Sequence, residues 1–86
     1  MPEISRFLGI VIAMFYMDHN PPHFHAYYGE YEAAIGIQDG AVLWGSLPRR
    51  ALGHVQEWRA SHIRELEEDW QRARAHQPLQ PIAPLE

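Results

Sequence analysis

The first half of the chain carries short apolar runs separated by turn residues. Residues 10–17 are continuously apolar and rich in β-branched and aromatic side chains, which predicts a strand buried on both faces. A shorter strand over residues 4–8 precedes it, joined through a tight turn at Gly9. Two more strands, over residues 23–28 and 31–37, flank Gly29-Glu30, a glycine-first pair typical of a type II′ hairpin.

The hairpins set a register for the predicted sheet. The first places Tyr28 opposite Tyr31, and a type I′ turn at Asp39-Gly40 places Ile35 opposite Trp44. Because strand side chains alternate between faces, this register predicts a core face and a polar face. The predicted core face carries Phe24, Ala26, Tyr28, Tyr31, Ala33, Ile35, Ile37, Val42 and Trp44. The predicted polar face carries His23, His25, Tyr27, Glu32, Ala34, Gly36 and Leu43.

From Ser46 onward the apolar period becomes helical, and Pro48 suits the first helical turn. The predicted fold is therefore α+β: a four- to five-stranded antiparallel meander, followed by one long C-terminal helix packed on one face. We expect this helix to be whole or broken between residues 59 and 62. Its buried stripe is predicted at Ala51, Leu52, Val55, Trp58, Ile63, Leu66, Trp70 and Ala73.

Residues 1–76 are predicted to form this single domain, and residues 77–86 a proline-rich tail. The tail has a period of three, the period of polyproline II, which aligns Leu79, Ile82 and Leu85 as one apolar ridge. That ridge could dock on the domain's own sheet, on a second subunit or on another protein. A disordered tail is the alternative, because chain ends commonly fray.

Composition narrows the classes of function. The net charge is −4 and the chain contains no lysine, so the strong basic field of a nucleic-acid binder is absent. With no cysteine, any metal site would use imidazole and carboxylate ligands. The N-terminus lacks a signal-peptide pattern, and the apolar run is too short to cross a bilayer, which predicts a cytoplasmic protein without membrane contact. A domain this small also favours a protein partner or a homo-oligomer.

Candidate chemistry gathers in the segment Asp18-His19-Asn20-Pro21-Pro22-His23-Phe24-His25. His23 and His25, two apart on one strand, point the same way and could share one divalent ion such as Zn, Ni or Cu. His19, on the proline-stiffened turn, would supply a third ligand. Glu32, on the neighbouring strand, would be a ligand or would orient an imidazole.

Two other interpretations of the segment stay open. Acid–base catalysis without a metal would use His23, His25, Tyr27 and Glu32, as in a ribonuclease-like phosphodiesterase. A structural role would make Asp18 and Asn20 turn caps and place the histidines at a subunit interface. In each case the small residues predicted opposite the histidines, Ala34 and Gly36, leave room beside the rings.

The same segment resembles the bacterial family called domain of unknown function 4160, together with Pro2-Glu3-Ile4-Ser5-Arg6-Phe7, Leu47-Pro48-Arg49-Arg50-Ala51-Leu52 and Glu57-Trp58. The resemblance points to His19, Asn20, Pro21, Pro22, His23 and His25 as the family's motif. It also implies a partner, since members are often encoded beside another small protein in an arrangement like a toxin–antitoxin pair. We therefore expect a partner-binding component with a histidine-centred site. A histidine- or metal-dependent nuclease or phosphodiesterase, and a purely structural interaction module, are the alternatives.

Overall fold

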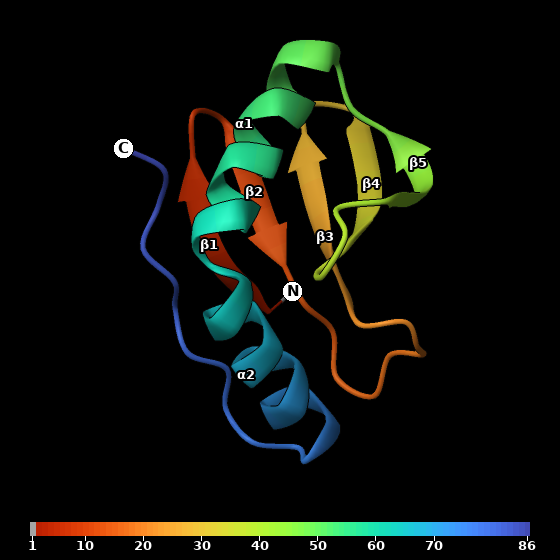
Figure 1. Cartoon of the computed structure of the whole chain (residues 1–86), viewed down its shortest axis with the longest axis vertical. Coiled ribbons are helices and arrows are strands. Elements are labelled where there is room, and N and C mark those ends of the chain that lie inside the picture. The colour runs from red at the N-terminus through yellow and green to blue at the C-terminus, as the bar shows by residue number, and fades with distance from the viewer. Residues whose placement is uncertain (1) are drawn as a thin grey trace.

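The computed structural model describes residues 2–86; residue 1, where the predicted domain begins, lies outside the described part. The elements in chain order are β1 (Glu3–Phe7), β2 (Ile10–Ala13), β3 (His23–Tyr28), β4 (Tyr31–Gly36), β5 (Val42–Ser46), α1 (Arg49–Ser61) and α2 (Ile63–Arg74). The five strands form one antiparallel sheet in the order β1-β2-β3-β4-β5. In Figure 1, α1 lies across one face of this sheet and α2 continues beyond its end. The predicted α+β meander is confirmed.

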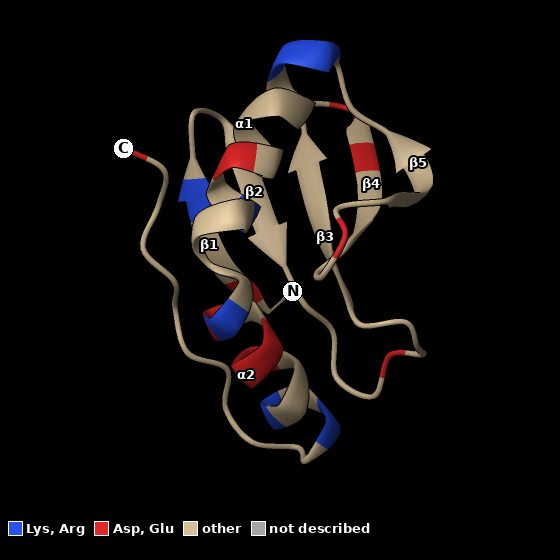
Figure 2. Cartoon of the chain, in the orientation of Figure 1, with Lys and Arg blue, Asp and Glu red and all other residues tan. Residues whose placement is uncertain are grey.

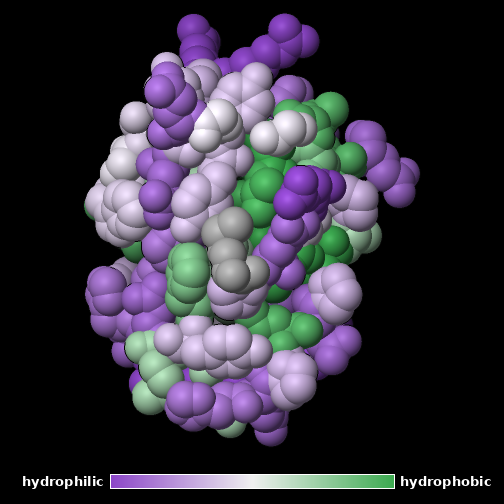
Figure 3. All heavy atoms as spheres, turned by 180° about the vertical axis from the view of Figure 1, so that it is seen from behind, coloured by the Kyte–Doolittle hydropathy of each residue, from purple (hydrophilic) through white to green (hydrophobic). Residues whose placement is uncertain are grey.

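The core lies between the sheet and α1. Phe24 and Ile35 pair across β3 and β4 and are fully buried. The indole of Trp58 on α1 contacts Phe24 edge-on, with ring centroids 5.8 Å apart, and lies 5.4 Å from the ring of Phe7. Helix α1 covers this side and α2 lies beyond the end of the sheet, whereas the opposite face exposes hydrophobic residues among hydrophilic ones (Figure 3).

The helix is broken where the sequence analysis allowed a break. Pro48 precedes α1, and its missing N–H is not needed there because first-turn donors have no intrahelical partner. At His62 the backbone leaves helical geometry (φ −132°, ψ 25°), and α2 starts at the next residue. The predicted stripe is buried on both helices at Ala51, Val55, Trp58, Leu66, Trp70 and Ala73.

The strand predicted over residues 10–17 is shorter in the structure and ends at Ala13. Beyond it the chain leaves the sheet, and Phe15 packs edge-on against the ring of His25, with centroids 4.8 Å apart. Tyr16 and Met17 are exposed. An apolar run therefore does not show where a strand ends, because here Phe15 packs on a ring of the sheet instead of pairing in the ladder.

The predicted second hairpin is wrong in its register. Five residues, 37–41, connect β4 and β5, and Asp39 accepts a hydrogen bond from the N–H of Ala41. A β-bulge then sets Trp44 opposite Ala34 instead of Ile35. Trp44 therefore lies on the histidine face, and Val42 is exposed, so neither belongs to the core. The register predicted for β3 and β4 is confirmed at every pair, from His23–Gly36 to Tyr28–Tyr31.

The proline-rich tail lies along the domain, beside α2 and β1 (Figure 1). Ile82 is buried, and Leu79 and Leu85 pack against the core. The predicted ridge thus docks on the chain's own domain. Within residues 2–86, neither helix is long and apolar enough to cross a membrane.

Candidate metal centre

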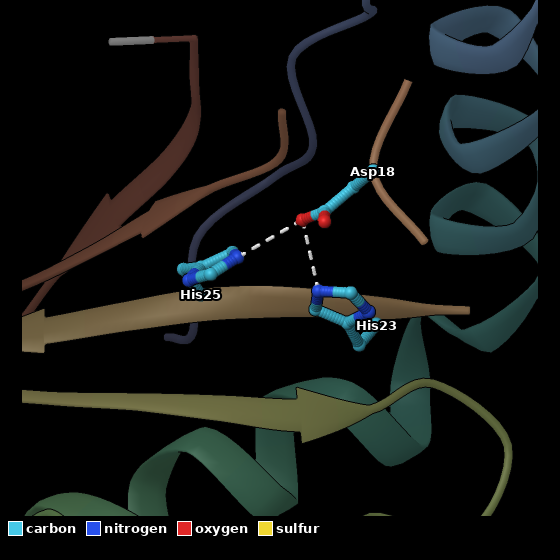
Figure 4. A group of neighbouring side chains, drawn as sticks. All are labelled: Asp18, His23 and His25. Atoms are coloured by element: carbon cyan, nitrogen blue, oxygen red, sulfur yellow. Dashed lines mark hydrogen bonds and ion pairs between the residues drawn. The ribbon is translucent and has the colours of Figure 1, made fainter. Parts of the chain in front are cut away.

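Asp18, His23 and His25 meet at the start of β3, where the loop from β2 returns to the sheet (Figure 4). One carboxylate oxygen of Asp18, Oδ2, lies 2.9 Å from Nε2 of His23 and 3.3 Å from Nε2 of His25. Ligand atoms around a divalent metal at about 2.0–2.2 Å lie roughly 3–3.5 Å apart, so these separations match those of a coordination shell. The three side chains can offer one ligand atom each, all within 4.8 Å of one another.

The hydrogen bonding of His23 fixes which of its nitrogens faces Asp18. Its Nδ1 lies 2.8 Å from the carbonyl oxygen of Pro21, which can only accept, so Nδ1 carries a proton. In a neutral ring Nε2 is then a bare acceptor, and it faces the acceptor Oδ2 of Asp18. A proton or a cation must lie between them. A histidine that donates one N–H to a backbone carbonyl and points its other nitrogen at a metal is the usual arrangement in metal sites.

His25 has a different surrounding. Its Nδ1 is buried and has no hydrogen-bond partner among the described residues, and the nearest carboxylate oxygen, Oε2 of Glu32, lies 3.5 Å away. The ring of Tyr27 is nearly parallel to that of His25, with centroids 6.5 Å apart. Burial and the neighbouring carboxylate of Glu32 raise the pKa of the Tyr27 phenol. The side chain of Glu32 can therefore orient His25 and hold Tyr27 neutral.

Aromatic side chains wall the site and exclude water from it. Phe15 and Trp44 contact the His25 ring edge-on, and Trp70 of α2 lies 5.4 Å from the ring of His23. His23 is 2 % and His25 7 % exposed, values at which a polar side chain requires a partner.

The carboxylate at the centre of the cluster is held in its charged form. Burial acts most strongly on the pKa of Asp18 and would raise it. The backbone N–H of His19 and the two buried imidazoles together outweigh burial, and the pKa of Asp18 is lowered. An ionised carboxylate beside two imidazole nitrogens is the donor set expected for a divalent transition metal.

The structure brings some of the predicted site residues together and leaves others apart. His23 and His25 converge, and Glu32 and Tyr27 lie beside them. The side chain of His19 is 82 % exposed, and its Nδ1 lies 3.0 Å from the other Asp18 oxygen, Oδ1, at the rim of the cluster. Its role as a ligand stays a prediction.

Asp18 is the member of the cluster that the sequence analysis missed, since it was interpreted only as a turn cap. The available signal was its position five residues before His23 across the Pro-Pro turn, which returns the chain onto the strand. Trp44 was missed because its face depends on the β-bulge.

Fold and cluster together define a small α+β protein with a buried group of two histidines and one carboxylate. The chain belongs to the family "Domain of unknown function (DUF4160)", whose model matches residues 9–71, well over half of the chain. The resemblance seen in the histidine motif is thereby confirmed. The comparisons found no curated protein and no solved structure that match the chain.

Proposed function

We propose that this domain binds one divalent transition metal ion through Asp18, His23 and His25. The observation that carries the proposal is the contact between Oδ2 of Asp18 and Nε2 of both histidines, at 2.9 and 3.3 Å. Three ligand atoms from two segments thus converge in a nearly dry site. The Pro21 carbonyl supports the proposal further, because it fixes the tautomer of His23 that a metal needs.

The donor set suits zinc, nickel or copper. Two imidazoles and one carboxylate also leave positions in the coordination shell for water or a substrate, as in catalytic zinc sites. When bound, such an ion would polarise a coordinated water or carbonyl. The protein's own contribution would be the fixed tautomer of His23 and the aromatic wall of Phe15, Trp44 and Trp70.

Metal-free acid–base catalysis fits the geometry less well. A base and an acid should reach different atoms of a substrate, whereas both imidazoles here point Nε2 at one oxygen of Asp18. Among residues 2–86, the ion pairs of the cluster join only histidines and carboxylates, so it offers no arginine for a phosphate. The structural alternative, a buried imidazolium–carboxylate pair, uses the same contacts and predicts no metal affinity.

The test is metal binding by the untagged full chain. We expect calorimetry with zinc, nickel and copper to give one ion per chain for at least one metal, and elemental analysis to find it after dialysis. Asp18→Asn, His23→Ala and His25→Ala should each abolish retention, whereas His54→Ala, which alters a histidine on α1, should not. A wild-type chain that stays metal-free, or binding that survives His23→Ala with His25→Ala, would overturn the proposal.

A second candidate function, binding of a protein partner, is supported by the surface of β5. All five residues of this edge strand are exposed, including Val42, Leu43 and Trp44, and none is charged (Figure 2). Charged residues on edge strands normally prevent strand pairing. The uncharged edge of β5 therefore suits an added strand from a partner, as expected of one component of a toxin–antitoxin-like pair.

Co-purification with the product of the adjacent gene tests this second proposal. We expect Leu43→Lys, on β5, to abolish the complex, and Leu8→Lys, at a more exposed apolar position on the β1–β2 turn, to leave it intact. A chain that stays monomeric with that product present would contradict it.

A further inference from the structure

The hydrogen bonds between the tail and the domain use backbone groups of the tail. The indole Nε1 of Trp58 donates to the carbonyl of Ala83 at 2.8 Å, and the carbonyl of Ile4 accepts from the N–H of Ile82 at 2.8 Å. The N–H of Gln80 donates to Oδ1 of Asp69, also at 2.8 Å. The Trp58 indole, the Ile4 carbonyl and the Asp69 carboxylate thus all bind main-chain groups of the tail and none of its polar side chains.

The tail's side chains divide by a period of three. Leu79, Ile82 and Leu85 face the domain, and Pro78, Pro81 and Pro84 are exposed. Three residues per turn is the period of polyproline II, a conformation in which the backbone has no internal hydrogen bonds. A polyproline II segment therefore offers its carbonyls and N–H groups outward, and an aromatic side chain with a donor is a common way to bind it.

We propose that the surface beneath the tail, where Ile4, Trp58 and Asp69 bind the tail backbone, is a recognition groove for proline-rich segments. The chain's own tail is its resident ligand, and a partner's segment in polyproline II conformation, with an apolar residue at every third position, displaces that tail. Because the groove binds main-chain groups and apolar residues at every third position, it accepts any segment with an apolar residue at that spacing. Trp58 and Asp69 belong to the family-matched region 9–71, whereas Ile4 and the tail lie outside it.

The groove also sets a rule for its ligand. Positions equivalent to Gln80 and Ile82 must carry an N–H, because Asp69 and Ile4 accept from them. Proline cannot occupy these two positions, but it fits at positions equivalent to Pro78, Pro81 and Pro84, which are exposed. This requirement provides a control peptide, since Gln80→Pro favours polyproline II and removes the N–H donor together with an exposed side chain.

The test uses the full chain and a fluorescein-labelled peptide with the sequence of residues 77–86. In wild type the tethered tail competes at high effective concentration, so Ile82→Asp, which releases the tail, should bind the peptide at least about tenfold more tightly than wild type. The Gln80→Pro peptide should bind this variant about tenfold more weakly, as expected when a buried acceptor loses its donor. At a peptide concentration near the dissociation constant of the first peptide, the indole N–H resonance of Trp58 should shift much more with that peptide than with the Gln80→Pro peptide.

Three results would overturn the proposal. One is equal peptide affinity for wild type and Ile82→Asp. The second is loss of folding in Ile82→Asp by circular dichroism, which would make the tail part of the core and not a ligand. The third is a wild-type dimer that Ile82→Asp converts to monomer, which would assign the groove to the tail of a second copy. Because the metal ligands lie outside this groove, the outcome is separate from that of the metal titration.

Discussion

Nδ1 of His23 lies 2.8 Å from the carbonyl oxygen of Pro21, and this contact holds the ring with Nε2 toward Asp18. His25 has no equivalent backbone partner, and its Nδ1 faces Glu32 at 3.5 Å. The two imidazoles of the cluster thus differ in how firmly they are oriented. The orientation of His25 depends on a side chain that is itself partly exposed.

This difference makes Glu32 a testable positioning residue. Replacing it with glutamine removes the negative charge beside His25, and changes to such outer groups typically weaken metal binding about 10–100-fold. We expect Glu32→Gln to lower zinc affinity by about tenfold in a competition titration with a chelating dye. Glu30→Gln, on the exposed turn between β3 and β4, is the matched control and should leave affinity unchanged. Equal losses in both variants would point to a general charge effect instead.

The tryptophans provide a second readout. Copper or nickel in the cluster would quench nearby indoles, and Trp44 and Trp70 lie 5.6 and 5.4 Å from the rings of His25 and His23. We expect fluorescence to fall on copper addition and the fall to be reduced in Trp44→Phe and in Trp70→Phe. Trp58, which packs in the core against Phe24, is the reference, and Trp58→Phe should keep most of the quenching. Quenching that depends on Trp58 alone would place the ion elsewhere.

The position of Trp44 shows which strand pairings the sequence pattern predicts and which it does not. Alternation and the Gly29-Glu30 pair were enough to predict every pairing of β3 with β4, because a two-residue turn leaves the register no freedom. The connection to β5 is longer and is followed by a bulge, so a Gly residue after Asp no longer determines which face Trp44 occupies.

The candidate site was predictable to a similar degree. The spacing of His23 and His25 on a strand predicts that they share a face, and the structure confirms it. Asp18 joins them through a loop whose path is not periodic, so only its nearness in sequence hinted at a role. The hydrogen bond from His23 to the Pro21 carbonyl has no sequence signal, since every residue carries a carbonyl.

Gly45, which pairs with Ala33 beyond the bulge, provides a test of the β5 register. Its φ is +78°, and a methyl group there would collide with the carbonyl oxygen of Glu32. We expect Gly45→Ala to destabilise the fold by about 2 kcal/mol, as strained non-glycine positions do, and to move Trp44 away from His25. Gly53, inside α1 with open space around it, is the control, and Gly53→Ala should stabilise by up to about 1 kcal/mol. Urea unfolding measures both, and a harmless Gly45→Ala would contradict the register described for β5.

The buried carboxyl of Asp69 leads to a prediction about how the stability of the fold depends on pH. Burial raises its pKa above the ordinary value, against the lowering effects of the Gln80 N–H and of Arg72, and Oδ2 has no partner among the described residues. A group with a raised folded-state pKa contributes stability below its unfolded pKa, about 3.9, and loses it as the pH rises through the folded value. Asp69→Asn should therefore be more stable than wild type at pH 7.

This advantage should disappear as the pH falls below about 4, where Asp69 is protonated in both states. Urea unfolding of wild type and Asp69→Asn at the two pH values measures the difference, and Glu68→Gln, an exposed neighbour on α2, controls for net charge. Asparagine keeps an oxygen that can accept from Gln80, so the tail contact is retained. If Asp69→Asn is instead less stable than wild type at pH 7, the ion pair with Arg72 outweighs burial, and Asp69 anchors the tail as a charged group.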